Sequence, residues 1–186
     1  MRYKLLYILF FLVVISCTRR SGPNSRPTNL YQDKKIAISV DNLNSKDSNS
    51  DFDYFVTVIK IVDGDTFDGL TQDQIEIRFR LHGIDAPERK QDFSAKSKDK
   101  LSELIFGKKV GIKVQKKRDG YGRPIVYVST PECEDIGAEM LKFGMAWHSK
   151  KYDDSELYNE IEKEARRSKI GLWSLSNPIP PWEYRE

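Results

Sequence analysis

The stretch IEIRFRL at residues 75–81 alternates strictly between apolar and charged side chains. Such alternation is typical of a β-strand with one buried face, and it places Arg78 and Arg80 together on the other face. Similar strand patterns lie on both sides of this stretch, at 55–62, 66–70, 110–115 and 125–128. Turns that contain glycine separate several of these strands. Short strands so close together in the chain predict a small β-barrel.

Helical patterns stand between these strands and after them. Apolar residues recur at helical spacing over 94–106 and 135–143, and each pattern is closed by a glycine. A third helix is predicted over 154–169, with Asp153 and Glu156 in the register of a capping box. The sequence therefore predicts an α+β fold, a small closed β-barrel with α-helices packed on its outside.

Composition limits the classes of protein that this chain can belong to. Its 186 residues, 39% of them hydrophobic, suit one folded domain with an extension and exclude wholesale disorder. Two cysteines exclude a cysteine-rich scaffold. The formal net charge of +3 is concentrated at the start of the chain, with +5 in residues 1–50 and −2 in residues 51–186. A polyanion bound by the domain would therefore need a local basic patch.

The first residues are typical of an export signal. Arg2 and Lys4 precede an apolar run, Leu5 to Ile15, which is shorter than the roughly 20 residues of a membrane-spanning helix. The following Val-Ile-Ser-Cys resembles a bacterial lipobox and predicts lipidation of Cys17. We expect an exported lipoprotein, anchored to a membrane through Cys17 and facing the periplasm or the cell surface. An ordinary cleaved signal and a short anchor are the alternatives.

The remaining boundaries follow from composition. Residues 1–16 are predicted to be a signal peptide, and residues 17–51, rich in Ser, Asn and Asp, a flexible tether. The folded domain is expected over 52–176, followed by a Pro-rich tail at 177–186. Cys133 is expected to be a half-buried loop thiol, unpaired if Cys17 carries lipid.

Three short motifs carry the chemistry. They are DGDT at 63–66, FRLHGIDAPE at 79–88 and DGYGR at 119–123. In this order and spacing they resemble the signature segments of the staphylococcal nuclease (thermonuclease) family, and GMAWH at 144–148 and GLWS at 171–174 match further landmarks. The resemblance covers residues 52–176. It implies a five-stranded OB-type barrel with three packed α-helices.

The resemblance also implies a metal site. Asp65 and Asp85 match the carboxylates that bind Ca²⁺ in the family, and a backbone carbonyl at the position of Ala86 completes the protein ligands. The founding member has Thr where this chain has Ala86, a change that keeps the carbonyl. Carboxylate and carbonyl oxygens are the ligands that Ca²⁺ prefers.

The catalytic side chains follow in the same way. Glu88 matches the carboxylate that orients water or removes its proton, and which of the two it does stays open. Arg80 and Arg123 match the pair of arginines that hold the scissile phosphate. Planar guanidinium groups suit this task because they donate two parallel hydrogen bonds to phosphate oxygens. Surface ion pairing among Arg80, Asp85 and Glu88 is the alternative reading of these residues.

Substrate contacts are expected around the DGYGR motif. Basic residues including Lys116 and Lys117 give residues 108–123 a local net charge of +6, which suits a phosphate backbone, although such a run can also be merely solvated. Tyr121 matches a family tyrosine beside the substrate phosphate, and Tyr152 is assigned to base stacking.

We therefore expect a Ca²⁺-dependent endonuclease that hydrolyses DNA and RNA and prefers single strands. The resemblance implies cleavage of the 5′ P–O bond, which leaves 3′-phosphates. The alternatives are a catalytically silent nucleic-acid-binding barrel and a surface adhesin. No obligate protein partner is implied, and we expect a monomer.

Overall fold

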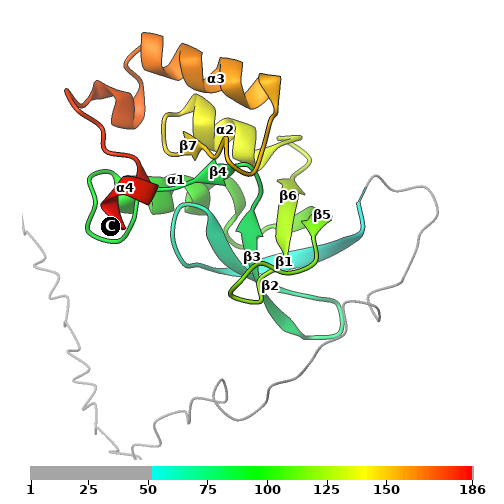
Figure 1. The fold of residues 1–186 in the computed structure, drawn as a ribbon. Helices are drawn as coiled ribbons and strands as arrows, with labels where there is room; N and C mark the ends of the chain where they lie inside the picture. Colours follow the sequence, from blue (N-terminus) through cyan, green and yellow to red (C-terminus); the bar gives the residue numbers. More distant parts are fainter. Residues whose placement is uncertain (1–51, 186) are drawn as a thin grey trace, which may run out of the picture. The chain divides into compact units, whose positions relative to one another are not determined.

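The computed structural model describes residues 52–185 (Figure 1). The predicted signal peptide, Cys17 and the tether up to residue 51 lie outside the described residues. Among the helices of residues 52–185, none has the length and apolar character that crossing a membrane requires.

Strands and helices follow one another in the order expected for an α+β domain. In chain order they are β1 (Tyr54–Ile61), β2 (Thr66–Leu70), β3 (Glu76–Leu81), β4 (Ile84–Asp85), α1 (Ser94–Ile105), β5 (Lys109–Lys116), β6 (Ile125–Ser129), α2 (Ile136–Lys142), β7 (Trp147–His148), α3 (Glu156–Arg167), the 3₁₀ helix η2 (Gly171–Ser174) and α4 (Pro181–Tyr184).

Five of the strands close into a barrel in the order β1, β2, β3, β6, β5. The pairs are antiparallel except for β3 and β6, which run parallel with Arg80 opposite Ile125. That pairing brings the end of β3 close to the turn before β6. The predicted five-stranded OB-type barrel with three packed α-helices is thus confirmed (Figure 1).

The barrel interior is filled by the apolar residues of the alternating strands. Phe67 and Phe79 stack on each other with ring centroids 5.3 Å apart, and both are fully buried. Burying side chains of this size contributes about 1.5–3 kcal/mol each. Because Phe79 and Leu81 point inward, Arg80 between them points out of the barrel, as the alternation predicts.

The helices agree with the sequence prediction in position but not at every end. The third helix, α3, begins at Glu156, and its N-cap is Ser155, whose side chain accepts a hydrogen bond from the backbone N–H of Tyr158. The predicted capping box of Asp153 and Glu156 is therefore wrong. The Asp153 carboxylate instead contacts two histidines, described below.

The segments GMAWH at 144–148 and GLWS at 171–174 contact each other through their glycines. Gly144 and Gly171 both have positive φ, and a Cβ on Gly171 would lie 2.3 Å from the carbonyl oxygen of Gly144. Leu172 donates a backbone hydrogen bond to that same oxygen. Beside this contact, Trp147 and Trp173 pack edge to face with centroids 5.4 Å apart. The GMAWH and GLWS segments thus join the last helices to the domain.

Candidate active site

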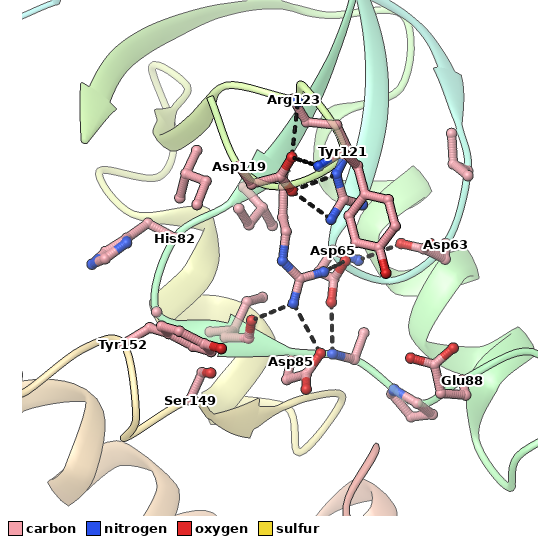
Figure 2. A pocket seen from close by; sticks show the side chains of 18 of the residues that line it. Asp63, Asp65, His82, Asp85, Glu88, Asp119, Tyr121, Arg123, Ser149 and Tyr152 are labelled. Atoms are coloured by element: carbon pink, nitrogen blue, oxygen red, sulfur yellow. Dashed lines mark hydrogen bonds and ion pairs between the residues drawn. The ribbon is translucent and has the colours of Figure 1, made fainter. Parts of the chain in front are cut away.

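A cleft of about 1310 Å³ opens on one side of the barrel. Among the residues that line it are nearly all of those predicted from the sequence to form the site: Asp65, Arg80, Asp85, Ala86, Glu88, Lys116, Tyr121, Arg123 and Tyr152. Lys117 does not line the cleft, and Cys17 lies outside the described residues. In Figure 2, Asp65, Asp85 and Glu88 lie below Asp119, Tyr121 and Arg123.

Arg80 joins the two carboxylates predicted to bind metal. Its Nη1 lies 2.5 Å from Oδ1 of Asp65, and its Nη2 lies 2.9 Å from Oδ1 of Asp85. The other oxygen of Asp65 accepts the backbone N–H of Ala86 at 2.8 Å. Asp65 directly precedes β2 and Asp85 lies in β4, and both are buried (Figure 2). Two elements of the fold therefore bring these oxygens to one place.

Buried charges at this end of the cleft shift one another's pKa values. Burial, together with the nearby Asp65 carboxylate, raises the pKa of Asp63 to about 6. Burial opposes the positive charge of Arg80, but the attraction of Asp65 and Asp85 outweighs it and raises the pKa of Arg80 above its ordinary value. Asp65 and Asp85 thus stabilise a positive charge that lies between them.

The donor set fits a hard divalent cation. Asp65 and Asp85 offer buried carboxylate oxygens that face the same space, and the backbone carbonyl predicted to join them belongs to the next residue, Ala86. Oxygen ligands completed by water are what Ca²⁺ accepts. Within residues 52–185, no group of three or more His, Cys, Asp or Glu side chains is arranged to hold a metal ion. A cation here would therefore rely on two protein carboxylates.

Arg123 is held by the turn that precedes β6. Its Nε lies 2.8 Å and its Nη2 2.7 Å from Oδ2 of Asp119. The other Asp119 oxygen accepts the backbone N–H groups of Tyr121 and Arg123 at 2.8 and 2.9 Å. Burial opposes ionisation of Asp119, but these hydrogen bonds from Arg123 and Tyr121 lower its pKa. Asp119 is thus a positioning residue that the sequence analysis missed.

A hydroxyl connects the two arginines. Thr66 Oγ1 donates to Asp65 Oδ1 at 2.9 Å and accepts from Arg123 Nη1 at 3.3 Å. Asp65 is in turn bonded to Arg80. A continuous chain of contacts therefore fixes the distance between the two guanidinium groups.

Aromatic and basic side chains border the cleft on its exposed side. Tyr121 is 88% exposed and Tyr152 71% exposed, although both line the cleft. The Arg123 guanidinium lies 5.2 Å from the centre of the Tyr121 ring. Lys116 lines the cleft and is exposed. Lys117, the next residue, is also exposed but does not line the cleft. Exposed rings and ammonium groups at and beside the cleft suit a polyanion with accessible bases.

Two histidines share one carboxylate at the far wall. Nε2 of His82 lies 3.1 Å from Oδ1 of Asp153, and Nε2 of His148 lies 2.8 Å from Oδ2. Both rings are buried, and His82 lines the cleft. Because Asp153 follows Tyr152 directly, this cluster fixes the segment that carries the tyrosine. His82 is 71 positions away from Asp153, so no local pattern of the sequence joins the two histidines through this carboxylate.

The Pro-rich tail also reaches the cleft. Arg185 lines it and contacts both Asp85 and Glu88. In Figure 1, α4 lies beside the segment that connects β4 to α1. No local pattern of the sequence predicts this contact, because Arg185 is 100 positions away from Asp85.

Comparison with known proteins agrees with this architecture. The family model for staphylococcal nuclease homologues matches residues 78–175. An uncharacterized endonuclease of Haemophilus influenzae is 41% identical over 128 residues, which cover 69% of this chain and 71% of that protein. The micrococcal nuclease of Shigella flexneri is 40% identical over 144 residues, covering 72% of this chain and 81% of the relative.

An uncharacterized endonuclease of Escherichia coli is 37% identical over 128 residues, covering 69% of this chain and 82% of its own length. The barrel, its cleft and these similarities define a nuclease hydrolase. The chain belongs to the staphylococcal nuclease family. The prediction that this protein is an enzyme is thereby confirmed, and it is preferred to the alternatives of a catalytically silent binding barrel and an adhesin.

Proposed function

We propose that this nuclease is a Ca²⁺-dependent endonuclease that acts on DNA and RNA and prefers single strands. It cleaves the 5′ P–O bond and leaves 3′-phosphates. The observation that carries the proposal is the convergence of Asp65, Asp85, Glu88, Arg80 and Arg123 on one cleft. These are the charged groups that phosphodiester hydrolysis requires in one place.

Metal binding falls to the buried acidic pair. Asp65 and Asp85, with the backbone carbonyl of Ala86, would hold Ca²⁺, which supplies positive charge at a phosphate oxygen when bound. Both carboxylates are already oriented, Asp65 by the backbone N–H of Ala86 and Asp85 by Arg80. Little rearrangement of the barrel is therefore needed for them to act together.

The remaining charged side chains act on water and on phosphate. Glu88 lies in the loop after β4 and is half-buried, so one carboxylate oxygen can accept a proton from the attacking water. As water adds to phosphorus, negative charge grows on the phosphoryl oxygens. Arg80 and Arg123 donate hydrogen bonds to those oxygens, and one of the two favours departure of the 5′-oxygen.

Preference for single strands follows from the exposed rim. Tyr121 and Tyr152 offer ring faces to bases, and only unpaired bases can stack on them. Lys116 and Lys117 supply positive charge along the phosphate backbone. Binding should therefore weaken as salt is raised and should weaken further when either tyrosine is replaced by alanine.

The proposal is tested with the full chain, purified in mild detergent. Cleavage of end-labelled single-stranded and duplex DNA, and of RNA, is followed with Ca²⁺, with Mg²⁺ and with chelator. We expect Ca²⁺-dependent products that carry 3′-phosphates, faster on single strands, and a loss of cleavage in Glu88→Gln. Glu164→Gln is a matched control, because Glu164 is an exposed residue of α3 paired with Arg167. Undiminished cleavage by Glu88→Gln would refute the assignment of Glu88.

We also propose that the protein is exported and anchored through lipid on Cys17. Support comes from the apolar run Leu5 to Ile15 and the lipobox-like residues before Cys17. Several acyl chains would anchor it stably, because each buried methylene contributes about 0.8 kcal/mol. Metabolic labelling with a fatty acid tests this: the label should appear in the unsubstituted chain and be absent from Cys17→Ser. Equal labelling of both would exclude Cys17 as the acceptor.

A further inference from the structure

The Pro-rich tail is attached to the candidate active site by a buried glutamine. Gln91 Nε2 donates a hydrogen bond to the carbonyl oxygen of Ile179 at 2.5 Å, while its Oε1 accepts the backbone N–H of Glu88 at 2.8 Å. Gln91 and Pro181 are both buried. One amide therefore connects the tail to the loop that carries Glu88, and α4 starts at this contact.

This attachment directs Arg185 towards two residues of the site. Its Nη2 lies 2.7 Å from Oδ1 of Asp85, and its Nε lies 2.5 Å from Oε1 of Glu88. A single guanidinium thus bridges the carboxylate assigned to metal binding and the carboxylate assigned to water. Arg80 reaches the same Asp85 oxygen at 2.9 Å. Two charge-assisted hydrogen bonds use both lone pairs of that oxygen.

A divalent cation at Asp85 would conflict with this arrangement. Oδ1 has no lone pair left for a metal, and a cation on the other oxygen would face the positive guanidinium at short range. One arginine must therefore move for the cation to bind. Arg80 has three acceptors, belongs to a barrel strand and is 19% exposed. Arg185 has two acceptors, follows a four-residue helix and is 46% exposed. Arg185 is the residue that can leave.

We propose that Arg185 competes with the activating divalent cation for Asp85 and stays hydrogen-bonded to the Glu88 carboxylate until that cation binds. This inference rests on the proposed roles of Asp85 and Glu88. When Arg185 leaves Asp85, its bond to Glu88 is lost as well, because both bonds are made by one planar group. The Glu88 carboxylate then becomes able to accept a proton from water. Metal binding and release of the water-activating carboxylate are thereby coupled.

The test measures Ca²⁺ binding directly rather than cleavage. Isothermal titration of the full chain with CaCl₂ compares the unsubstituted protein with Arg185→Ala, Arg185→Lys and a chain that ends after Ser176. Arg167→Ala controls for the loss of one positive charge far from the cleft. We expect Arg185→Ala and the shortened chain to bind Ca²⁺ about threefold to tenfold more tightly, since half-exposed ion pairs are modest in strength. Circular dichroism confirms that each variant is folded.

Gln91→Ala provides a second variant, because it keeps Arg185 and releases the tail. It should also tighten Ca²⁺ binding, by a smaller factor. Unchanged or weaker binding in both Arg185→Ala and the shortened chain would overturn the inference. Asp65→Asn separates this from the proposed function. If Asp65→Asn abolishes Ca²⁺ binding while Arg185→Ala leaves it unchanged, only the role of Arg185 fails. If the unsubstituted chain binds no Ca²⁺, both the metal assignment and this inference fail.

Discussion

Replacement of Arg123 offers the most direct test of how the cleft works. Its side chain makes two short contacts with Asp119 and a longer one with Thr66. After Arg123→Ala, Asp119 still accepts the backbone N–H groups of residues 121 and 123, so the turn keeps its shape. We expect a loss of about 1 kcal/mol in the free energy of unfolding. Turnover should fall much further, by about 10²- to 10³-fold, the usual cost of removing one donor to a developing negative charge.

The assay combines initial rates at saturating substrate with urea unfolding. Arg123→Lys belongs in the series, because it keeps the positive charge but loses the planar pair of donors, and it should recover only part of the rate. Arg167→Ala removes an equal charge from α3 and should leave the rate unchanged. A rate for Arg123→Ala within about threefold of the unsubstituted enzyme would refute the role of Arg123 in stabilising charge. A large loss of stability would show instead that Arg123 is structural.

Three further predictions concern the framework of the site. Gly64→Ala should destabilise the protein by about 3 kcal/mol in urea unfolding, because the new Cβ would lie 1.8 Å from Ser97 Oγ; a loss below about 1 kcal/mol would contradict this. Asp153→Ala should lower the free energy of unfolding by about 2 kcal/mol, since it leaves the buried rings of His82 and His148 without their shared partner. An unchanged midpoint of urea unfolding would contradict this prediction. The lowered pKa of Asp119 means that its ionised form stabilises the fold above pH about 4 and that this contribution disappears as the pH falls further. Asp119→Asn should therefore reduce stability at pH 7 by about 1 kcal/mol and far less at pH 3; an equal loss at both would be inconsistent with the linkage.

The sequence predicts the barrel well, because alternation is a local signal. The strand at residues 75–81 and the helices at 94–106 and 135–143 were found within one or two residues of their ends. The assignment of catalytic and metal-binding roles stays a prediction, although the cleft brings those residues together. The short β4–β7 pair escaped prediction, because two residues on each side leave no periodicity to detect.

The remaining differences arise from contacts between distant segments. Asp153 occupies a position that local rules assign to a helix cap, but two buried histidines are stronger partners for its carboxylate. Arg185 and Gln91 likewise have no local signature. Gln91 reaches a carbonyl 88 positions further along the chain, and no spacing rule addresses such a pair. Local sequence patterns thus predict helices and strands, whereas the hydrogen-bond partners of a polar side chain depend on the folding of the whole domain.

The parallel pairing of β3 with β6 makes hydrolysis depend on complete folding. Arg80 and Arg123 are brought together only when these two strands, separated by β4, α1 and β5, lie side by side. Parallel, non-local pairs form late and slowly, since the intervening chain must first be ordered. A newly synthesised chain that has not closed its barrel therefore has no assembled active site. A cell that makes this enzyme is protected from it for as long as the polypeptide stays unfolded.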